Sequence, residues 1–297
     1  MEKKINQTRP VTPILVVIMV LTVFLTFSQT KIHVEANVRT LVSEPVGDDM
    51  EVDLDGSIYL SDYGGKHIRR VTPAGEVQIL VSNYPKIGAI AIDEKFIYAA
   101  SWDYGILLRF NKDGTFVDTL ARNLKGPSAI VLNKAGEIFV AENAAHRISR
   151  IDYDGKVTTL VQGKPLVWPT SLTIDATGNL YTTNMFHGEV FRISETAEVT
   201  HMATLPAVAD GRYNLAYTCF LNNDLYVAHM DKHQIFKIAP NGTVTVLAGT
   251  GAAGEKDGGL QKAEFDTPQG LACSPDGSKM YVTDGKEGNM RLRVINF

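Results

Sequence analysis

The chain has 297 residues, of which 44% are hydrophobic and 21% charged, and its formal net charge is −4. This composition is that of an ordinary globular protein, so it excludes a disordered or fibrous chain. The slightly acidic balance gives no electrostatic reason to bind nucleic acid, and we predict no nucleic-acid partner. Two cysteines in so long a chain do not make a disulfide scaffold. We expect Cys219 and Cys273 to be buried thiols, with a disulfide between them as the alternative.

The N-terminal segment differs from everything that follows it. Basic residues precede an uncharged apolar run at 14–27, and a polar stretch comes next. This arrangement is typical of an export signal, whereas a membrane-spanning helix usually needs about 20 apolar residues. We predict that residues 1–36 are a signal peptide cleaved after Ala36, or an uncleaved anchor that meets the membrane only through residues 14–27. In both cases residues 37–297 would lie outside the cytoplasm, secreted or anchored.

One short pattern recurs six times after this segment. It ends on an aromatic residue followed by small and polar ones, and the aromatic positions lie 39 to 55 residues apart: Tyr59, Tyr98, Phe139, Tyr181, Tyr226 and Tyr281. This period is typical of propeller blades. The third unit shows four β-rich runs separated by turns with Gly and Asp, which predicts four antiparallel strands. The sequence therefore predicts an all-β, six-bladed β-propeller over residues 37–297.

The last unit has only three β-rich runs before the chain ends at Phe297. Residues 38–42 precede the first unit and match the fourth-strand pattern of residues 157–161. We predict that residues 38–42 complete the last blade and so remove the open edge between the first and last blades. A closed ring of this kind is expected to be a monomer.

The repeat resembles the NHL repeat. The resemblance rests on Asp62 with His67-Ile68, on Glu142 with His146-Arg147-Ile148, and on Pro268-Gln269-Gly270-Leu271. It implies a propeller related in fold to gluconolactonases, senescence-marker proteins and streptogramin B lyases. Such propellers serve as binding platforms, lyases and hydrolases, so the resemblance specifies the architecture better than the function.

Compared with the gluconolactonase family, the chain departs from the metal-binding pattern that the resemblance implies. Asp48 falls where that family has a Glu ligand. Ser128 and Thr170 fall where it has Asn, and Asn214 falls where it has the Asp that acts as ligand and base. Losing that carboxylate removes charge and proton-transfer capacity together. A lactonase of that kind is therefore not expected.

Candidate site residues fall into two rings on one face of the propeller, because strand A begins and strand B ends at the same face. The strand-B ring lies three residues after each repeated aromatic: Asp62, Ser101, Glu142, Asn184, His229 and Asp284. The strand-A ring lies at the start of each unit: Asp48, Gly88, Ser128, Thr170, Asn214 and Gln269.

From these rings we predict three kinds of role. A divalent cation (Ca, Mg, Mn or Zn) would be held by oxygen ligands from Asp48, Glu142, Asn184 and Asp284. His229 and Glu142 would act as acid or base. A ligand would be bound by Asp62, Trp102, Asn184, Asn214 and Gln269. The competing interpretation is structural: Asp62 and Asp284 cap turns, and His229 is a satisfied core histidine.

Two further sets stay open. Tyr63, Trp102, Met185 and Met230 follow the strand-B ring by one position, and they would form either an apolar platform at the mouth of the channel or core between blades. His67, His146, His187 and His233 look like a metal cluster, but the repeat places them in different blades, so each is expected to pack locally. We predict an NHL-type propeller outside the cytoplasm that binds a small molecule, a glycan or a protein at its channel face. The alternative is a metal-assisted lyase or hydrolase of the streptogramin lyase or gluconolactonase type.

Overall fold

The computed structural model describes residues 35–297 except 65, 85, 213 and 287. The predicted leader therefore lies outside the described residues but for its last two, Glu35 and Ala36. In the part of the chain that is described, no helix is long and apolar enough to cross a membrane. Residues 35–297 form a structural unit of their own, distinct from residues 1–34.

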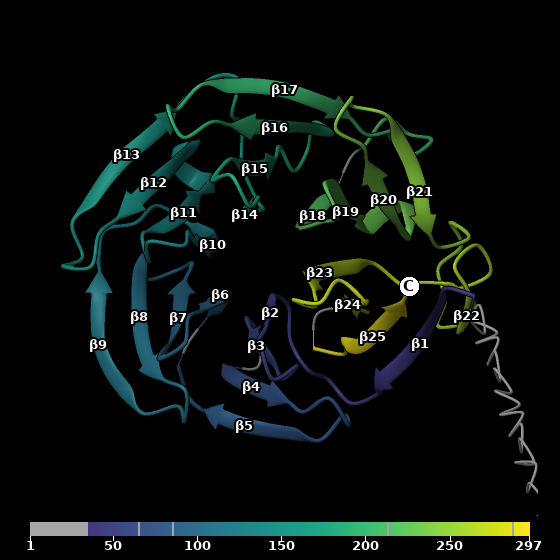
Figure 1. Cartoon of the computed structure of the whole chain (residues 1–297), viewed down its shortest axis with the longest axis horizontal. Helices are drawn as coiled ribbons and strands as arrows, with labels where there is room; N and C mark the ends of the chain where they lie inside the picture. Colours follow the sequence, from purple (N-terminus) through teal and green to yellow (C-terminus); the bar gives the residue numbers. More distant parts are fainter. Residues whose placement is uncertain (1–34, 65, 85, 213, 287) are drawn as a thin grey trace, which may run out of the picture. The chain divides into compact units, whose positions relative to one another are not determined.

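Six antiparallel sheets form a closed ring around a central axis (Figure 1). The first three blades contain β2 (Met50–Val52), β3 (Ile58–Asp62), β4 (His67–Val71) and β5 (Val77–Val81); β6 (Ile87–Ile92), β7 (Phe96–Ser101), β8 (Ile106–Asn111) and β9 (Phe116–Ala121); and β10 (Pro127–Leu132), β11 (Ile138–Glu142), β12 (Arg147–Ile151) and β13 (Val157–Gln162). The next two contain β14 (Thr173–Ile174), β15 (Leu180–Thr183), β16 (Glu189–Ile193) and β17 (Val199–Thr204); and β18 (Leu215–Leu221), β19 (Asp224–His229), β20 (Gln234–Ile238) and β21 (Val244–Ala248). The sixth contains β23 (Pro268–Cys273), β24 (Lys279–Asp284), β25 (Arg291–Asn296), β1 (Asn37–Val42) and β22 (Gly258–Gly259). Two short 3₁₀ turns follow strand B in blades three and five: η1 (Asn143–Ala145) and η2 (Met230–Lys232). The prediction of an all-β six-bladed propeller is confirmed.

The repeated aromatic residue packs in the core between blades, and in two blades it also holds a turn. Its ring packs in the core between neighbouring blades, as where Tyr98 of the second blade shares a cluster with Ile130 and Val140 of the third. Its hydroxyl binds the Asp that closes the preceding turn: Tyr98 Oη lies 2.8 Å from Asp93 Oδ2. The same contact joins Tyr181 to Asp175 at 3.0 Å. In the second and fourth blades one residue thus holds both the blade interface and the A–B turn, whereas Phe139 of the third blade has no hydroxyl for the second contact.

The ring closes through the N-terminal strand, as predicted. β1 pairs antiparallel with β25, Val38 facing Ile295 and Arg39 facing Val294. A contact that the sequence did not suggest protects the outer edge of β1, where Val38 pairs with Gly258 of β22. The buried Arg293 ties this seam together, since its guanidinium donates to Asp284 Oδ2 and Asp257 Oδ1 at 2.8 Å each. The two ends of the propeller are therefore joined by strand pairing and by an ion-pair network.

Cys219 of β18 and Cys273 of β23 form a disulfide, with their Cα atoms 6.1 Å apart. The expectation of two buried thiols is thus wrong, and the alternative holds. The two strands are the innermost strands of adjacent blades, which the sequence could not place side by side. The bond joins blades five and six, and disulfides are typical of proteins that fold in oxidising compartments outside the cytoplasm.

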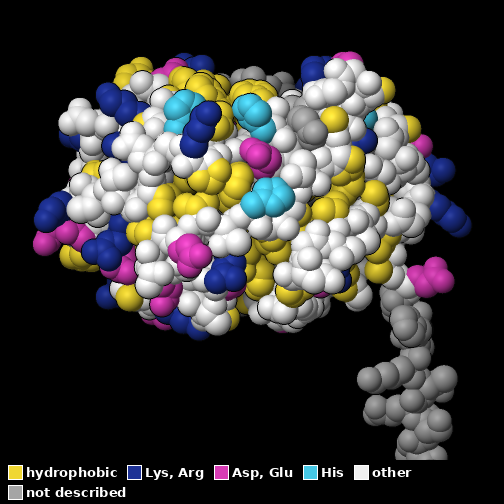
Figure 2. Space-filling view, turned by 90° about the horizontal axis from the view of Figure 1, so that it is seen from above, with side chains coloured by type: hydrophobic (Ala, Val, Ile, Leu, Met, Phe, Trp, Pro, Cys, Tyr) yellow, Lys and Arg dark blue, Asp and Glu magenta, His cyan; other side chains and the backbone are white. Residues whose placement is uncertain are grey.

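The edge of the ring that includes β17 has side chains of both charges (Figure 2). Figure 2 shows acidic and basic side chains interspersed among polar groups and strips of hydrophobic side chains on this side.

Candidate functional site

A cavity of about 320 Å³ opens where the innermost strands begin, and we call it the channel-face pocket. The start of strand A in each of the six blades contributes to it: Asp48, Gly88, Ser128, Thr170, Ala216 and Gln269. The residues that follow strand B contribute the large side chains: Tyr63, Trp102, Met185 and Met230. Pro127 and Tyr217 complete the described lining. The open question about the four large residues is thus answered, because they line the pocket.

Strand register explains why the fifth blade contributes Ala216. Leu215 pairs with His229 as Pro127 pairs with Glu142 in the third blade. The residue after Leu215 is therefore equivalent to Ser128. Asn214, which the sequence pattern assigns to this ring, lies two positions earlier, and its amide Nδ2 is 3.4 Å from Asp231 Oδ1. Asn214 is not among the described residues that line the pocket.

Tyr217 forms the floor of the channel-face pocket. Its hydroxyl donates across the channel to the carbonyl oxygens of Gly88 at 2.7 Å and Ser128 at 3.2 Å. Burial, with the negative charges of Asp49 and Asp48, holds the pKa of Tyr217 well above its usual value. Sequence reasoning missed this residue. The available signal was a bulky side chain at a position where the other blades have Ala, Gly, Ser or Asp.

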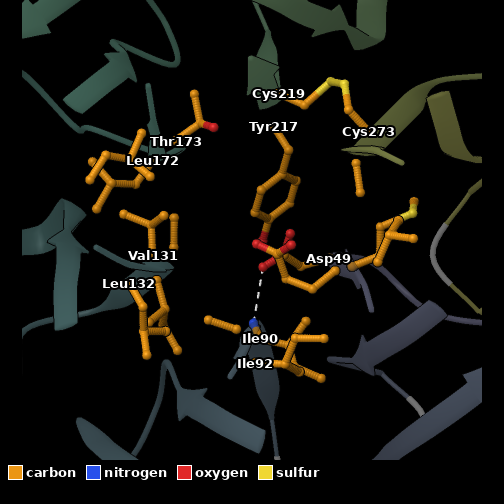
Figure 3. A pocket seen from close by; sticks show the side chains of 18 of the residues that line it. Asp49, Ile90, Ile92, Val131, Leu132, Leu172, Thr173, Tyr217, Cys219 and Cys273 are labelled. Atoms are coloured by element: carbon orange, nitrogen blue, oxygen red, sulfur yellow. Dashed lines mark hydrogen bonds between the residues drawn. A yellow bond between two sulfur atoms is a disulfide. The ribbon is translucent and has the colours of Figure 1, made fainter. Parts of the chain in front are cut away.

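Beyond Tyr217 lies a second cavity of about 420 Å³, at the end of the channel where strands A turn into strands B. Figure 3 shows Tyr217 extending toward Asp49 and Ile90, with the Cys219–Cys273 disulfide on the neighbouring wall. Asp49 Oδ2 accepts a hydrogen bond from Ile90 N at 3.0 Å. Burial raises the pKa of Asp49 well above its usual value and that of Glu51 to about 7. Tyr217 lines both cavities and separates them.

The aromatic walls of the channel-face pocket are held by hydrogen bonds from outside it. The Trp102 indole Nε1 donates to Asn143 Oδ1 at 3.0 Å. Gly126 lies against this pair, since a Cβ there would come within 2.9 Å of Trp102 Nε1. The Tyr63 hydroxyl donates to Asp103 Oδ1 at 3.3 Å. These anchors fix the rings before any ligand arrives, which lowers the entropic cost of binding.

Glu142 of the strand-B ring is fully buried and committed to structure. Its carboxylate accepts from Arg147 Nε and Nη2 at 2.7 Å each, and from Lys125 N at 2.7 Å. Ser149 Oγ donates to the same group. Burial opposes ionisation, but these donors together outweigh it and hold the pKa of Glu142 below its usual range. A carboxylate stabilised in this way is a weak base.

Asn184 and His229 bind the backbone of the loop that leads into their own blade. Asn184 accepts from Val167 N at 2.9 Å and donates to Pro165 O at 2.9 Å. His229 Nε2 donates to Pro206 O at 3.2 Å, and burial lowers the pKa of His229 to about 4. Both side chains are fully buried and neither lines the channel-face pocket among the described residues.

The two Asp residues of the strand-B ring are each paired with an arginine of strand C. Asp284 accepts from Arg293 and also from Asp266 N at 2.6 Å, while burial raises its pKa to about 6. Asp62 forms an ion pair with Arg69, whose guanidinium also donates to Val46 O at 2.9 Å. These contacts are those of the structural interpretation, in which the residue at the end of strand B holds a nearby loop.

Two of the NHL-type histidines make the same local contact in different blades. His146 Nδ1 accepts from Trp168 N at 2.9 Å, and His233 Nδ1 accepts from Thr267 N at 3.2 Å. In each case the donor immediately precedes the proline that begins the next blade. These contacts agree with the expectation of local packing.

The resemblance implies a divalent cation, and the residues of this chain do not fit one well. Within the described ranges, no group of three or more His, Cys, Asp or Glu side chains is arranged to hold a metal. Asp48 lines the channel-face pocket, whereas Glu142, Asn184 and Asp284 are bound to loops or arginines elsewhere. The hydroxyls of Ser128 and Thr170 donate to the carbonyls of Pro169 and Trp168 at 3.1 and 3.2 Å. We derive no step through a metal.

Solved structures with the same fold have various functions. A catalytically inactive virginiamycin B lyase from Staphylococcus aureus with quinupristin superposes with a TM-score of 0.64 at 18% identity, over 89% of this chain and 100% of that one. A gluconolactonase from Xanthomonas campestris gives 0.68 at 14% identity, over 88% and 89%. An auxiliary nutrient binding protein from Bacteroides thetaiotaomicron gives 0.74 at 17% identity, over 88% and 76%. At these identities the likeness shows the fold alone.

Two curated proteins share sequence with parts of the chain. Protein SUPPRESSOR OF QUENCHING 1, chloroplastic, from Arabidopsis thaliana is 33% identical over 86 residues, or 29% of this chain. Teneurin-3 from Danio rerio is 26% identical over 223 residues, or 58% of this chain. The match spans only 8% of the length of either relative. Residues 87–230 match the family described as SMP-30/Gluconolactonase/LRE-like region, so blades two to four and the first two strands of blade five are similar to that family.

Proposed function

We propose that residues 37–297 bind a small, largely apolar organic molecule in the channel-face pocket. The observation that carries the proposal is the composition of the lining, in which anchored aromatic rings and thioethers surround a few polar groups. A cavity of about 320 Å³ has the size at which small-molecule sites begin. This favours a compact molecule over a glycan or a protein, for which the lining offers few hydrogen-bonding groups.

Binding is better supported than catalysis by a lyase or hydrolase. The candidates for acid or base, His229 and Glu142, are fully buried and hydrogen-bonded to Pro206 and Arg147 respectively. A general acid or base must come within hydrogen-bonding reach of the reacting proton. No contact of the described residues gives either group that position.

We further propose that the propeller works outside the cytoplasm as a monomer, secreted or anchored through its N-terminal segment. The Cys219–Cys273 disulfide supports the compartment. Fractionation of cells separates the two forms, since a soluble product without residues 1–36 indicates a signal peptide and a full-length product in membranes indicates an anchor.

The test of the binding site is to fill it. Gly88 lines the pocket, and a Cβ there would meet only Tyr63 Cδ2 at 3.4 Å, an ordinary contact. We expect the wild-type protein to bind 2-naphthol, a neutral aromatic probe, and Gly88→Leu to weaken binding at least tenfold without loss of the fold. Ala135→Leu, in an exposed turn, is the matched control and should bind as the wild type does. Binding that survives Gly88→Leu, or that is absent from the wild type, would refute the site.

A further inference from the structure

The channel-face pocket combines three aromatic rings, two thioethers and one carboxylate. The rings belong to Tyr63, Trp102 and Tyr217, and the carboxylate belongs to Asp48. Among the described lining residues there is no Lys, Arg or His. We propose that the ligand carries an organic cation, such as a quaternary or protonated amine, which the rings and Asp48 hold. This inference rests on the proposed function, because it specifies the ligand of the same pocket.

The physical reason is the charge distribution of an aromatic ring. The face of the ring is negative, so a cation within about 6 Å of its centroid is attracted to it, and a cage of several faces recognises methylated ammonium groups. Such a cation has an apolar surface that packs on methionine thioethers as well as on rings. A neutral ligand of the same shape would make the same dispersion contacts but would not gain the electrostatic attraction.

Asp48 is held in place at the wall of the pocket. Its Oδ2 accepts a hydrogen bond from Tyr63 N at 2.7 Å. The residue after it, Asp49, lines the cavity on the other side of Tyr217. The Asp48 carboxylate therefore lies at the wall of the pocket, where it favours a positive ligand over a negative one.

One lysine lies near the cage, outside the described lining. Lys86 Nζ is 4.3 Å from the centroid of the Tyr63 ring and 3.7 Å from Asp103 Oδ2. Its charge is thus balanced by an adjacent carboxylate and screened by solvent, as both side chains are about two-fifths exposed. Because the Lys86 ammonium lies over the Tyr63 ring, we expect Trp102 and Tyr217 to supply most of the aromatic contact with the cation.

A small metal ion suits the pocket less well than an organic cation does. Calcium and magnesium take six or more oxygen ligands in most sites. Here the hydroxyls of the described lining all donate their protons to backbone carbonyls or to a carboxylate, which leaves Asp48 and the Gln269 amide as the other oxygen-bearing side chains of that lining. An anion is excluded on the same evidence, because the described lining offers it no positive group.

The direct test compares choline with 3,3-dimethylbutan-1-ol, which has the same shape and no charge. Binding is followed by the fluorescence of Trp102 in a Trp168→Phe background, which leaves a single tryptophan. We expect choline to bind at least tenfold more tightly and its affinity to fall as salt is raised. Equal affinities, or tighter binding of the alcohol, would overturn the proposal. If 2-naphthol also fails to bind, the proposed function fails as well; if only the preference for charge is missing, the binding site stands and the inference does not.

Substitutions test which residues cause the preference for the charged ligand over the neutral one. Asp48→Asn keeps an acceptor for Tyr63 N while removing the charge, and we expect it to reduce the choline-to-alcohol affinity ratio to about one. Glu94→Gln is the matched control, since it removes one carboxylate at the opposite end of the channel, and it should leave the ratio unchanged. In a Trp102→Leu variant, calorimetry should show choline affinity reduced more than alcohol affinity. If Asp48→Asn does not fold, the salt dependence of wild-type choline binding decides, and its absence counts against the proposal.

Discussion

Two rings of six residues lie at the same face of this propeller and have different roles in the structure. The strand-B ring contains most of the charged and polar side chains that suggest chemistry, and two of them, Glu142 and Asp284, are buried against loops and arginines. The strand-A ring contains small and inconspicuous residues such as Gly88 and Ala216, and it surrounds the pocket. The difference teaches that in a repeat fold a conspicuous polar residue can serve only to hold a nearby loop or strand, while small residues leave the space in which a ligand fits.

The two rings should therefore respond differently to substitution. Changes in the strand-B ring are expected to reduce stability, because a buried polar group that loses its partner keeps its cost of desolvation. Changes in the strand-A ring are expected to alter binding with little effect on stability. The following experiments test this division, beginning with strand β1, which closes the propeller.

Deletion of residues 37–42 should have the largest effect. It removes β1, whose Val38 and Val42 are buried, and exposes an unpaired edge of β25. Burial of two valines stabilises by roughly 3–6 kcal/mol, which corresponds to a fall in melting temperature of about 10 °C or more in a domain of this size. Arg39→Ala, at an exposed position of the same strand, should change melting very little. An unchanged melting temperature in the deletion would show that β1 does not close the ring.

Glu142→Ala should cost about 3 kcal/mol of unfolding free energy, the lower end of the range for breaking a buried ion pair. The lower end applies because the Arg147 side chain left behind is 21% exposed. Arg150→Ala breaks the pair with Glu137 on the exposed side of the same strand, and should cost less than about 1 kcal/mol. Urea unfolding measures both. A Glu142→Ala protein that is as stable as Arg150→Ala would remove the distinction between the rings.

His229 should make stability depend on pH. Burial lowers its folded pKa from 6.5 to about 4, so the unfolded chain binds more protons between these values and stability falls as the pH is lowered through this window. Below pH 4 the buried His229 lowers the unfolding free energy by its full amount, about 3 kcal/mol. Asp284 acts in the opposite direction, since its raised pKa of about 6 makes its contribution fall as the pH rises. The contribution of His229 is therefore measured as the difference in unfolding free energy between the wild type and a variant that lacks this histidine.

His229→Gln keeps a donor for Pro206 O and does not titrate, so it isolates this contribution. Unfolding free energies measured at several pH values should lose, in the variant, the part of the slope between pH 6.5 and 4 that His229 causes. Parallel curves for variant and wild type would mean that His229 is accessible to protons in the folded protein, and its role as a possible acid or base would have to be reconsidered.

The fold was largely predictable because each blade repeats the same physical solution. The aromatic of strand B packs between blades, and in the second and fourth blades its hydroxyl binds the turn Asp, so one residue reports a whole unit. The match of residues 38–42 to a missing strand also needed no three-dimensional information. β22 was not predictable, because Gly258 and Gly259 have low strand propensity and pair only where the chain happens to pass β1.

The site was less predictable because it depends on contacts between neighbouring strands and between blades. Whether a strand-B carboxylate faces the channel depends on an arginine of the adjacent strand C, as with Asp62 and Arg69 or Asp284 and Arg293. Both arginines occupy the same position of strand C, since they pair with Leu60 and Val282, each two residues before the Asp. Reading strand C beside strand B would have revealed these partners. Tyr217 could not be placed in this way, because its hydrogen bonds reach blades two and three across the channel.

The smallest expected change in stability tests the strand-A ring at Gln269, which lines the pocket without any hydrogen bond among the described side chains. Gln269→Ala should change the unfolding free energy by no more than about 0.5 kcal/mol, as for other partly exposed sites away from special features. Its amide is one of the few polar groups in the lining, so the substitution should weaken a ligand with a hydroxyl, such as choline, more than tetramethylammonium, which has none. Titration of both ligands into both proteins measures this. If Gln269→Ala is as destabilising as Glu142→Ala, or weakens neither ligand, the strand-A ring has no separate role in recognition.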